Sequence, residues 1–197
     1  MAVQLARHLI AAVLVLIVSS PLVRAEGNGT IEGTVTARPA RYLPDTVVYL
    51  ASVPGTHPRR TAEMDQRGMT FVPHILTITA GDTVRFLNHD PLDHNLSSPD
   101  CGYDLGTWGQ GGQRTRTFDK AGVCTQICKL HPEMLAYIFV GQNPYAAAVD
   151  KSGRYTISDV PPGTYELSVW NGHLKGDSRK ITVTAGAAAH ADLTVHR

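Results

Sequence analysis

The chain has 197 residues and a formal net charge of +1, and 43% of its residues are hydrophobic. This length allows one large or two small domains, each with enough core for a stable fold. The ordinary hydrophobic fraction excludes a disordered or collagen-like chain. The nearly balanced charge argues against nucleic acid as a partner.

The first residues have the layout of a secretory signal peptide. Arg7 and His8 form a short basic start, residues 9–18 are wholly apolar, and residues 23–25 form a small-x-small cleavage site. The apolar run is shorter than the roughly 20 residues that cross a bilayer, although an uncleaved amphipathic anchor is the alternative. We predict a signal peptide over residues 1–25, a periplasmic or otherwise exported protein, and no membrane span after cleavage.

Short alternating or β-branched stretches predict strands through the rest of the chain. In order, they cover residues 30–36, 46–50, 76–79, 83–87, 115–118, 123–127, 137–140, 154–157, 165–170, 180–184 and 191–195. Turn signals such as Ala80-Gly81-Asp82 separate them. No long stretch has a helical period. The pattern predicts an all-β fold made of sandwiches.

The richest group of metal-binding side chains lies between two predicted strands. Cys128, His131 and Met134 place a thiolate, an imidazole and a thioether within seven residues. A blue-copper centre needs one Cys and two His in a trigonal plane with a weak axial Met. His94 follows the predicted strand 83–87, and loops at one end of a sandwich can meet. The residues therefore predict one copper ion, cycling between Cu(I) and Cu(II), on these four ligands.

Several segments of this region together resemble the cupredoxins of the amicyanin and plastocyanin type. They are residues 69–73, residues 81–84, the His94-Asn95 pair and the Cys128-x2-His131-x2-Met134 loop, which has amicyanin-like spacing. The resemblance covers about residues 62–143. It implies a Greek-key sandwich, a second-shell Asn95 that ties the ligand loops together, and one-electron transfer. Asp93 departs from the Pro that many relatives have before the first His; it either favours the oxidised ion or is a solvated loop acid.

A second resemblance flanks the copper region. Residues 29–35 and 47–50, together with residues 150–155 and 160–167, resemble the two halves of a carboxypeptidase regulatory-like, transthyretin-type β-sandwich. The two strands before residue 60 would be marginal alone. We therefore predict that a cupredoxin domain over residues 61–143 is inserted into a discontinuous sandwich of residues 26–60 and 144–197. Three units in series are the alternative.

The three cysteines leave two interpretations open. An exported chain with an odd number of cysteines needs a partner other than a disulfide for one of them. Cys101 and Cys124 can form a disulfide, which leaves Cys128 for metal. Alternatively, the Cys124-x3-Cys128 pair resembles the binuclear CuA centre of oxidase subunit II, although its spacing to the following His differs by one residue.

Four functions follow from these patterns. The first is a type-1 copper electron carrier, not an enzyme, which exchanges electrons with redox proteins such as a dehydrogenase, a cytochrome or a reductase. The second is copper storage or delivery. The third is the CuA-like site, and the fourth is a docking module in the regulatory-like sandwich. No nucleophilic, phosphate-loop or paired-carboxylate motif indicates an enzyme.

Overall fold

The computed structural model describes residues 27–197, so the predicted signal peptide lies outside the described residues. The described chain is built almost wholly of β-strands, which confirms the predicted all-β class. The elements are β1 (Gly29–Ala37), η1 (Ala40–Asp45), β2 (Thr46–Leu50), β3 (Thr61–Gln66), β4 (Phe71–Val72), β5 (Ile75–Thr79), β6 (Asp82–Asn88), β7 (His94–Ser98), β8 (Tyr103–Trp108), β9 (Gln113–Phe118), β10 (Gly122–Ile127), β11 (Leu135–Gly141), β12 (Ala146–Ala148), β13 (Arg154–Val160), β14 (Gly163–Asn171), β15 (Lys175–Gly176), β16 (Ser178–Val183), β17 (Ala188–His190) and β18 (Leu193–His196).

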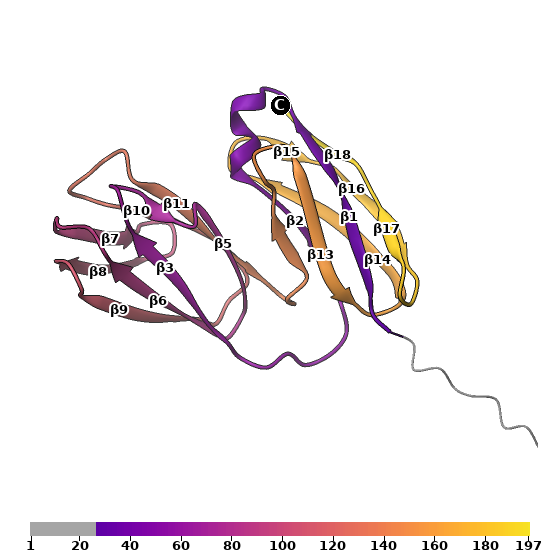
Figure 1. The fold of residues 1–197 in the computed structure, drawn as a ribbon, viewed down its shortest axis with the longest axis horizontal. Coiled ribbons are helices and arrows are strands. Elements are labelled where there is room, and N and C mark those ends of the chain that lie inside the picture. The colour runs from indigo at the N-terminus through magenta and orange to yellow at the C-terminus, as the bar shows by residue number, and fades with distance from the viewer. Residues whose placement is uncertain (1–26) are drawn as a thin grey trace, which may run out of the picture.

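The strands form two pairs of sheets, which lie side by side in Figure 1. One pair has the orders β5-β11-β10-β7-β8 and β4-β3-β6-β9. The other has the orders β13-β1-β18-β15, with β17 also paired to β1, and β12-β2-β14-β16. The chain thus leaves the second pair after β2, forms the first pair, and returns at β12. We call the pair that contains β3–β11 the inserted sandwich and the other the outer sandwich. The exact domain boundaries stay a prediction.

Each sandwich has a core that follows from alternation along its strands. Every second residue of β1 is buried, so Ile31 and Val35 enter the outer core while Glu32 and Thr34 face water. In β6 the buried positions include Val84 and Phe86, which are fully buried in the inserted core. Both strands were predicted from the sequence, the first of them from its alternation through Ile31, Gly33 and Val35.

Strand β11 is different because it is buried on both faces. Its residues from Ala136 onward are all buried, and Ala136 and Ile138 pack into the inserted core. Tyr137 and Phe139 point the other way and form a separate buried cluster with Val47 of the outer sandwich. A continuous apolar run is expected for a strand covered on two sides. The two sandwiches therefore share a packed interface along β11.

Polar contacts extend this interface. Asp45, at the end of η1, is hydrogen-bonded through Oδ1 to Nε2 of His74 at 2.6 Å, and its Oδ2 lies 3.0 Å from Nε2 of His173, within ion-pair distance. His74 belongs to the inserted sandwich and His173 to the outer one. The rings of Tyr137 and Trp170 also meet edge to face, with centroids 5.2 Å apart.

Within residues 27–197, no helix is long and apolar enough to cross a membrane.

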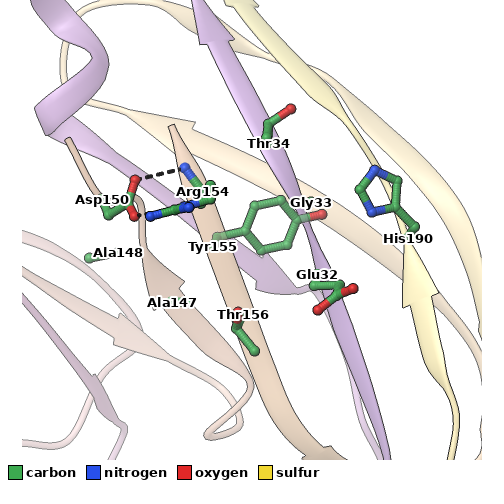
Figure 2. Close-up of a pocket in the computed structure, with 10 residues that line it drawn as sticks. All are labelled: Glu32, Gly33, Thr34, Ala147, Ala148, Asp150, Arg154, Tyr155, Thr156 and His190. Carbon is green, nitrogen blue, oxygen red and sulfur yellow. Dashed lines mark hydrogen bonds and ion pairs between the residues drawn. The ribbon is translucent and has the colours of Figure 1, made fainter. Parts of the chain in front are cut away.

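The turn that precedes β13 depends on one ionised carboxylate. Asp150 accepts hydrogen bonds from the side chain and backbone of Ser152 and from the backbone of Arg154. The guanidinium of Arg154 also pairs with Asp150, and Figure 2 shows these two residues side by side. These bonds, with the Ser152 hydroxyl first, lower the pKa of Asp150 to about 2. The folded state therefore favours the ionised form of Asp150.

Asp150→Asn should lower the urea midpoint of unfolding above pH 4, and this effect should shrink as the pH falls to about 2. A depressed folded pKa gives stability that is complete above the unfolded pKa of 3.8 and is lost as the pH falls through about 2. Urea titrations at pH 6, 4 and 2 measure the difference. Glu166→Gln, at an exposed position on β14, is the control. A gap between wild type and Asp150→Asn that is as large at pH 2 as at pH 6 would contradict the assignment.

Candidate metal centre

Three of the predicted ligands meet at one end of the inserted sandwich. A ligand atom from each of His94, Cys128 and His131 lies within 4.8 Å of the other two. Nδ1 of His94 is 3.0 Å from Nδ1 of His131, and Sγ of Cys128 is 3.6 Å from that same nitrogen. Among residues 27–197 this is the only group of three or more His, Cys, Asp or Glu side chains that meets this criterion.

The backbone delivers these residues from two sheet-forming segments. His94 is the first residue of β7, not part of a loop as the sequence suggested, and it pairs with Trp108 of β8. Cys128 follows the last residue of β10, and the ligand loop, residues 128–134, leads into β11. Two strand ends and one short loop thus place the ligands.

The ligand loop is closed by its own hydrogen bonds. The backbone N–H of Met134 donates to the carbonyl of His131 at 3.0 Å, and that of Cys128 donates to the carbonyl of Met134 at 3.4 Å. Cys128 and Met134 are almost fully buried, whereas His131 is half-buried. Met134 lies in the same buried cluster as Cys128. Its role as the axial ligand stays a prediction.

A carboxylate that sequence reasoning missed fixes the ring of His94. Nε2 of His94 donates to Oδ2 of Asp90 at 2.8 Å, and both side chains are buried. Asp90 also accepts hydrogen bonds from the backbone N–H groups of Gly68 and Met69. Burial acts to raise the pKa of Asp90, but the bonds from Met69, Gly68 and His94 outweigh it and lower the pKa. An ionised Asp90 keeps the proton of His94 on Nε2 and leaves the Nδ1 lone pair free.

Asn95 joins β7 to the ligand loop. Its backbone N–H points to Sγ of Cys128 at 3.3 Å, and its side-chain carbonyl accepts from the backbone N–H of Lys129 at 3.3 Å. Its amide group donates to Asp104 and to the carbonyl of Gly106. The N–H contact holds the sulfur of Cys128 beside the start of β7.

The other two cysteines form a disulfide. Cys101 and Cys124 are joined across 23 positions of sequence, and Cys128 is the free cysteine. Asp100, beside Cys101, also accepts the backbone N–H of Thr125, beside Cys124. The disulfide occupies Cys124, so the CuA-like alternative lacks its second thiolate here.

The remaining predictions for this end have mixed outcomes. Asp93 is exposed, and its carboxylate lies near Gly109 rather than among the ligand atoms. Met64 is fully buried in the core, whereas Met69 is 42% exposed. It sits in a left-handed turn whose backbone binds Asp90.

The outer sandwich has a surface pocket of about 520 Å³. Figure 2 shows the residues that line it. Its lining includes Glu32, Thr34, Arg154, Thr156 and His190, all of them exposed. They project from neighbouring strands without converging on a common point, and Arg154 is paired with Asp150. The pocket therefore offers no ligand set comparable with that of the inserted sandwich.

The chemistry of the donor set fits copper. A thiolate, two imidazoles and a nearby thioether are soft and borderline ligands, which suit copper in a trigonal site. The arrangement can hold an ion firmly while one ligand, His131, reaches the surface.

Comparisons with known proteins give limited matches. The family model for domain II of polysaccharide lyase family 4 matches residues 141–191, well under half of the chain. That stretch lies where the sequence predicted a carboxypeptidase regulatory-like sandwich, and this assignment stays a prediction. Among curated proteins, no relative matches.

The similar solved structures are mainly cupredoxins. A reduced amicyanin mutant is 23% identical with a TM-score of 0.39 and covers 41% of this chain and 81% of its own. A purple cupredoxin from Nitrosopumilus maritimus is 22% identical with a TM-score of 0.38, covering 41% and 99%. A copper-containing nitrite reductase from Thermus scotoductus SA-01 is 26% identical with a TM-score of 0.41, covering 48% and 25%. The proposals below rest on the geometry of the site.

Proposed function

We propose that this protein is an exported type-1 copper protein that carries single electrons. The observation that carries the proposal is the convergence of His94 Nδ1, Cys128 Sγ and His131 Nδ1 within 4.8 Å. Copper bound by these atoms, with Met134 as a weak axial ligand, would accept and release one electron. The disulfide between Cys101 and Cys124 suits an oxidising compartment such as the periplasm.

The residues around the site support electron transfer rather than catalysis. Asp90 holds His94 in one tautomer, and the loop hydrogen bonds of His131 and Met134 limit movement of the ligands. Four protein ligands leave no open position of the kind that metal-ion catalysis uses. A site that holds one geometry in both oxidation states is suited to rapid electron exchange.

The surface near His131 supports docking of a redox protein. The large hydrophobic side chains that are exposed in the described chain are Met69, Val72, Leu92, Leu130 and Leu135. Leu130 lies in the ligand loop, Leu135 follows it, and Leu92 precedes His94 by two residues. Met69 and Val72 belong to the β3–β4 turn region that binds Asp90. Exposed apolar side chains near a ligand loop suit contact with another protein, and we propose a dehydrogenase as donor and a cytochrome or reductase as acceptor.

Copper storage or delivery is the second candidate. The exposed thioether of Met69 favours it, because thioethers bind Cu(I) and this one lies near the ligand end. Delivery requires an ion that dissociates easily, whereas Cys128 and Met134 are at most 2% exposed to solvent. The outer sandwich as a docking module stays a further prediction.

Absorption and electron paramagnetic resonance spectra of the copper-loaded chain test the proposal. We expect an intense visible thiolate-to-copper band and the spectrum of a single type-1 ion. A colourless oxidised protein would refute the proposal, and a mixed-valence spectrum would support the binuclear alternative. Rapid loss of Cu(I) to a chelator without unfolding would instead support delivery.

A further inference from the structure

A charged pair lies directly behind the contact between Asn95 and the ligand loop. Oδ1 of Asp104, on β8, accepts the side-chain amide of Asn95 at 2.9 Å. Its other oxygen, Oδ2, accepts from Nζ of Lys129 at 2.7 Å. Asp104 thus joins β7, β8 and the ligand loop through a single carboxylate.

Lys129 is held to the sandwich at two points. Its backbone N–H donates to Oδ1 of Asn95, and its ammonium group pairs with Asp104. Lys129 directly follows Cys128, so any displacement of Lys129 moves the backbone that carries the thiolate. The bond from Lys129, then those from Gly106 and Asn95, lowers the pKa of Asp104 to about 2. The carboxylate is therefore ionised at neutral pH.

We propose that Asp104 and Lys129 are positioning residues that clamp the ligand loop and cancel each other's charge beside the copper site. This inference rests on the proposed function. The structural alternative is an ordinary surface ion pair, since the two side chains are 40% and 57% exposed and many such pairs contribute little to stability. The clamp differs from an ordinary pair because Asp104 also bonds the buried Asn95.

Loss of the Asp104 charge and loss of the Lys129 charge should shift the reduction potential of the copper in opposite directions. Loss of the Asp104 charge leaves the ammonium of Lys129 uncompensated near the ion, which favours the less positive Cu(I) and raises the potential. Loss of the Lys129 charge leaves the carboxylate uncompensated and lowers it. Because both charges are partly exposed, solvent and salt reduce these shifts but do not reverse their sign.

The experiment compares Asp104→Asn, Lys129→Met and the double variant with wild type, all copper-loaded full chains. Release of Cu(I) to bicinchoninate and the reduction potential are measured for each. We expect Cu(I) release to be about tenfold faster for Asp104→Asn, which weakens the charge-assisted bonds to both Asn95 and Lys129. Release should be about threefold faster for Lys129→Met, which removes only the exposed ion pair. The potential should rise in the first, fall in the second, and return close to wild type in the double variant, whose release stays fast.

Matched variants separate the clamp from a general loss of charge. Glu63→Gln breaks the Glu63–Arg85 pair of β3 and β6, whose side chains are similarly exposed and contact no predicted ligand. It should release copper as wild type does. Lys129→Arg, which can still pair with Asp104, should restore slow release. This variant and Lys129→Met lie on an exposed loop position, so they keep the test valid if Asp104→Asn fails to fold.

The outcomes distinguish the clamp from the proposed function. If wild type lacks a type-1 spectrum, the proposed function fails. If wild type has that spectrum but the Asp104 and Lys129 variants match Glu63→Gln in both release and potential, only the clamp is overturned. Potential shifts of the same sign in both single variants would also overturn it, because charge cancellation requires opposite signs.

Discussion

Replacing Cys128 with serine should abolish the intense visible band of the copper-loaded protein. The band requires a thiolate bound to the ion, and a serine hydroxyl neither ionises at neutral pH nor donates charge as sulfur does. Cys128 is also the sole free cysteine of residues 27–197, so no second thiolate can replace it. The measurement is the visible spectrum after loading Cys128→Ser with Cu(II) and removing unbound ion.

A disulfide-free variant is the matched control for this loss. Cys101→Ala combined with Cys124→Ala should keep the band and lower the free energy of unfolding by about 3 kcal/mol, the contribution expected from a cross-link of this span. Retention of the band in Cys128→Ser would refute the ligand assignment. Loss of the band in the folded double variant would point instead to a site that uses Cys124.

Asp90→Asn should weaken copper binding by 10-fold to 100-fold, an order-of-magnitude range typical of lost partners of metal-binding histidines. Nε2 of His94 loses its charged acceptor, so the ring no longer favours the tautomer with a free Nδ1. The backbone N–H groups of Gly68 and Met69 lose part of their acceptor as well, at a cost of about 1–3 kcal/mol in unfolding free energy. Competition with a chelator of known affinity measures the first effect and urea titration the second.

Asp65→Asn provides a control with a similar pair outside the site. Both carboxylate oxygens of Asp65 lie 2.8 Å from Nδ1 of His89, but His89 is exposed and is not a predicted ligand. Its copper affinity should equal that of wild type. If Asp90→Asn were destabilised yet bound copper equally well, Asp90 would support the turn at Met69 and not orient His94.

The sequence predicted the fold class, and it singled out the His94, Cys128 and His131 side chains that meet in the structure, but it did not indicate the hydrogen bonds around them. Strand β11 and the alternating strands β1 and β6 stand out because burial follows their hydrophobic pattern. Strands β7 and β8 were missed because the buried positions of β7 are largely polar, including Asn95 and Ser97, and β8 contains Gly106 at positive φ. Period-two hydrophobicity cannot identify a strand whose interior hydrogen-bonds instead of packing.

The supporting carboxylates were missed for a different reason. Asp90 lies four residues before His94 in a segment rich in loop residues, where sequence spacing does not imply contact. Asp104 meets Lys129 across 25 positions, and this contact exists only because β7 and β8 pair in one particular register. Ligand types can be recognised from residue identity, whereas the groups behind them depend on three-dimensional pairing.

The buried cluster shared by the two sandwiches has a consequence for diffusion and docking. Because Tyr137 and Phe139 pack against Val47 and Trp170, we expect the two sandwiches to rotate together in solution and not independently. A partner protein bound to the outer sandwich would then find the surface around His131 in a fixed orientation. The entropy of orienting one sandwich relative to the other is lost during folding. A second contact, made at the surface around His131, therefore adds little entropic cost to binding.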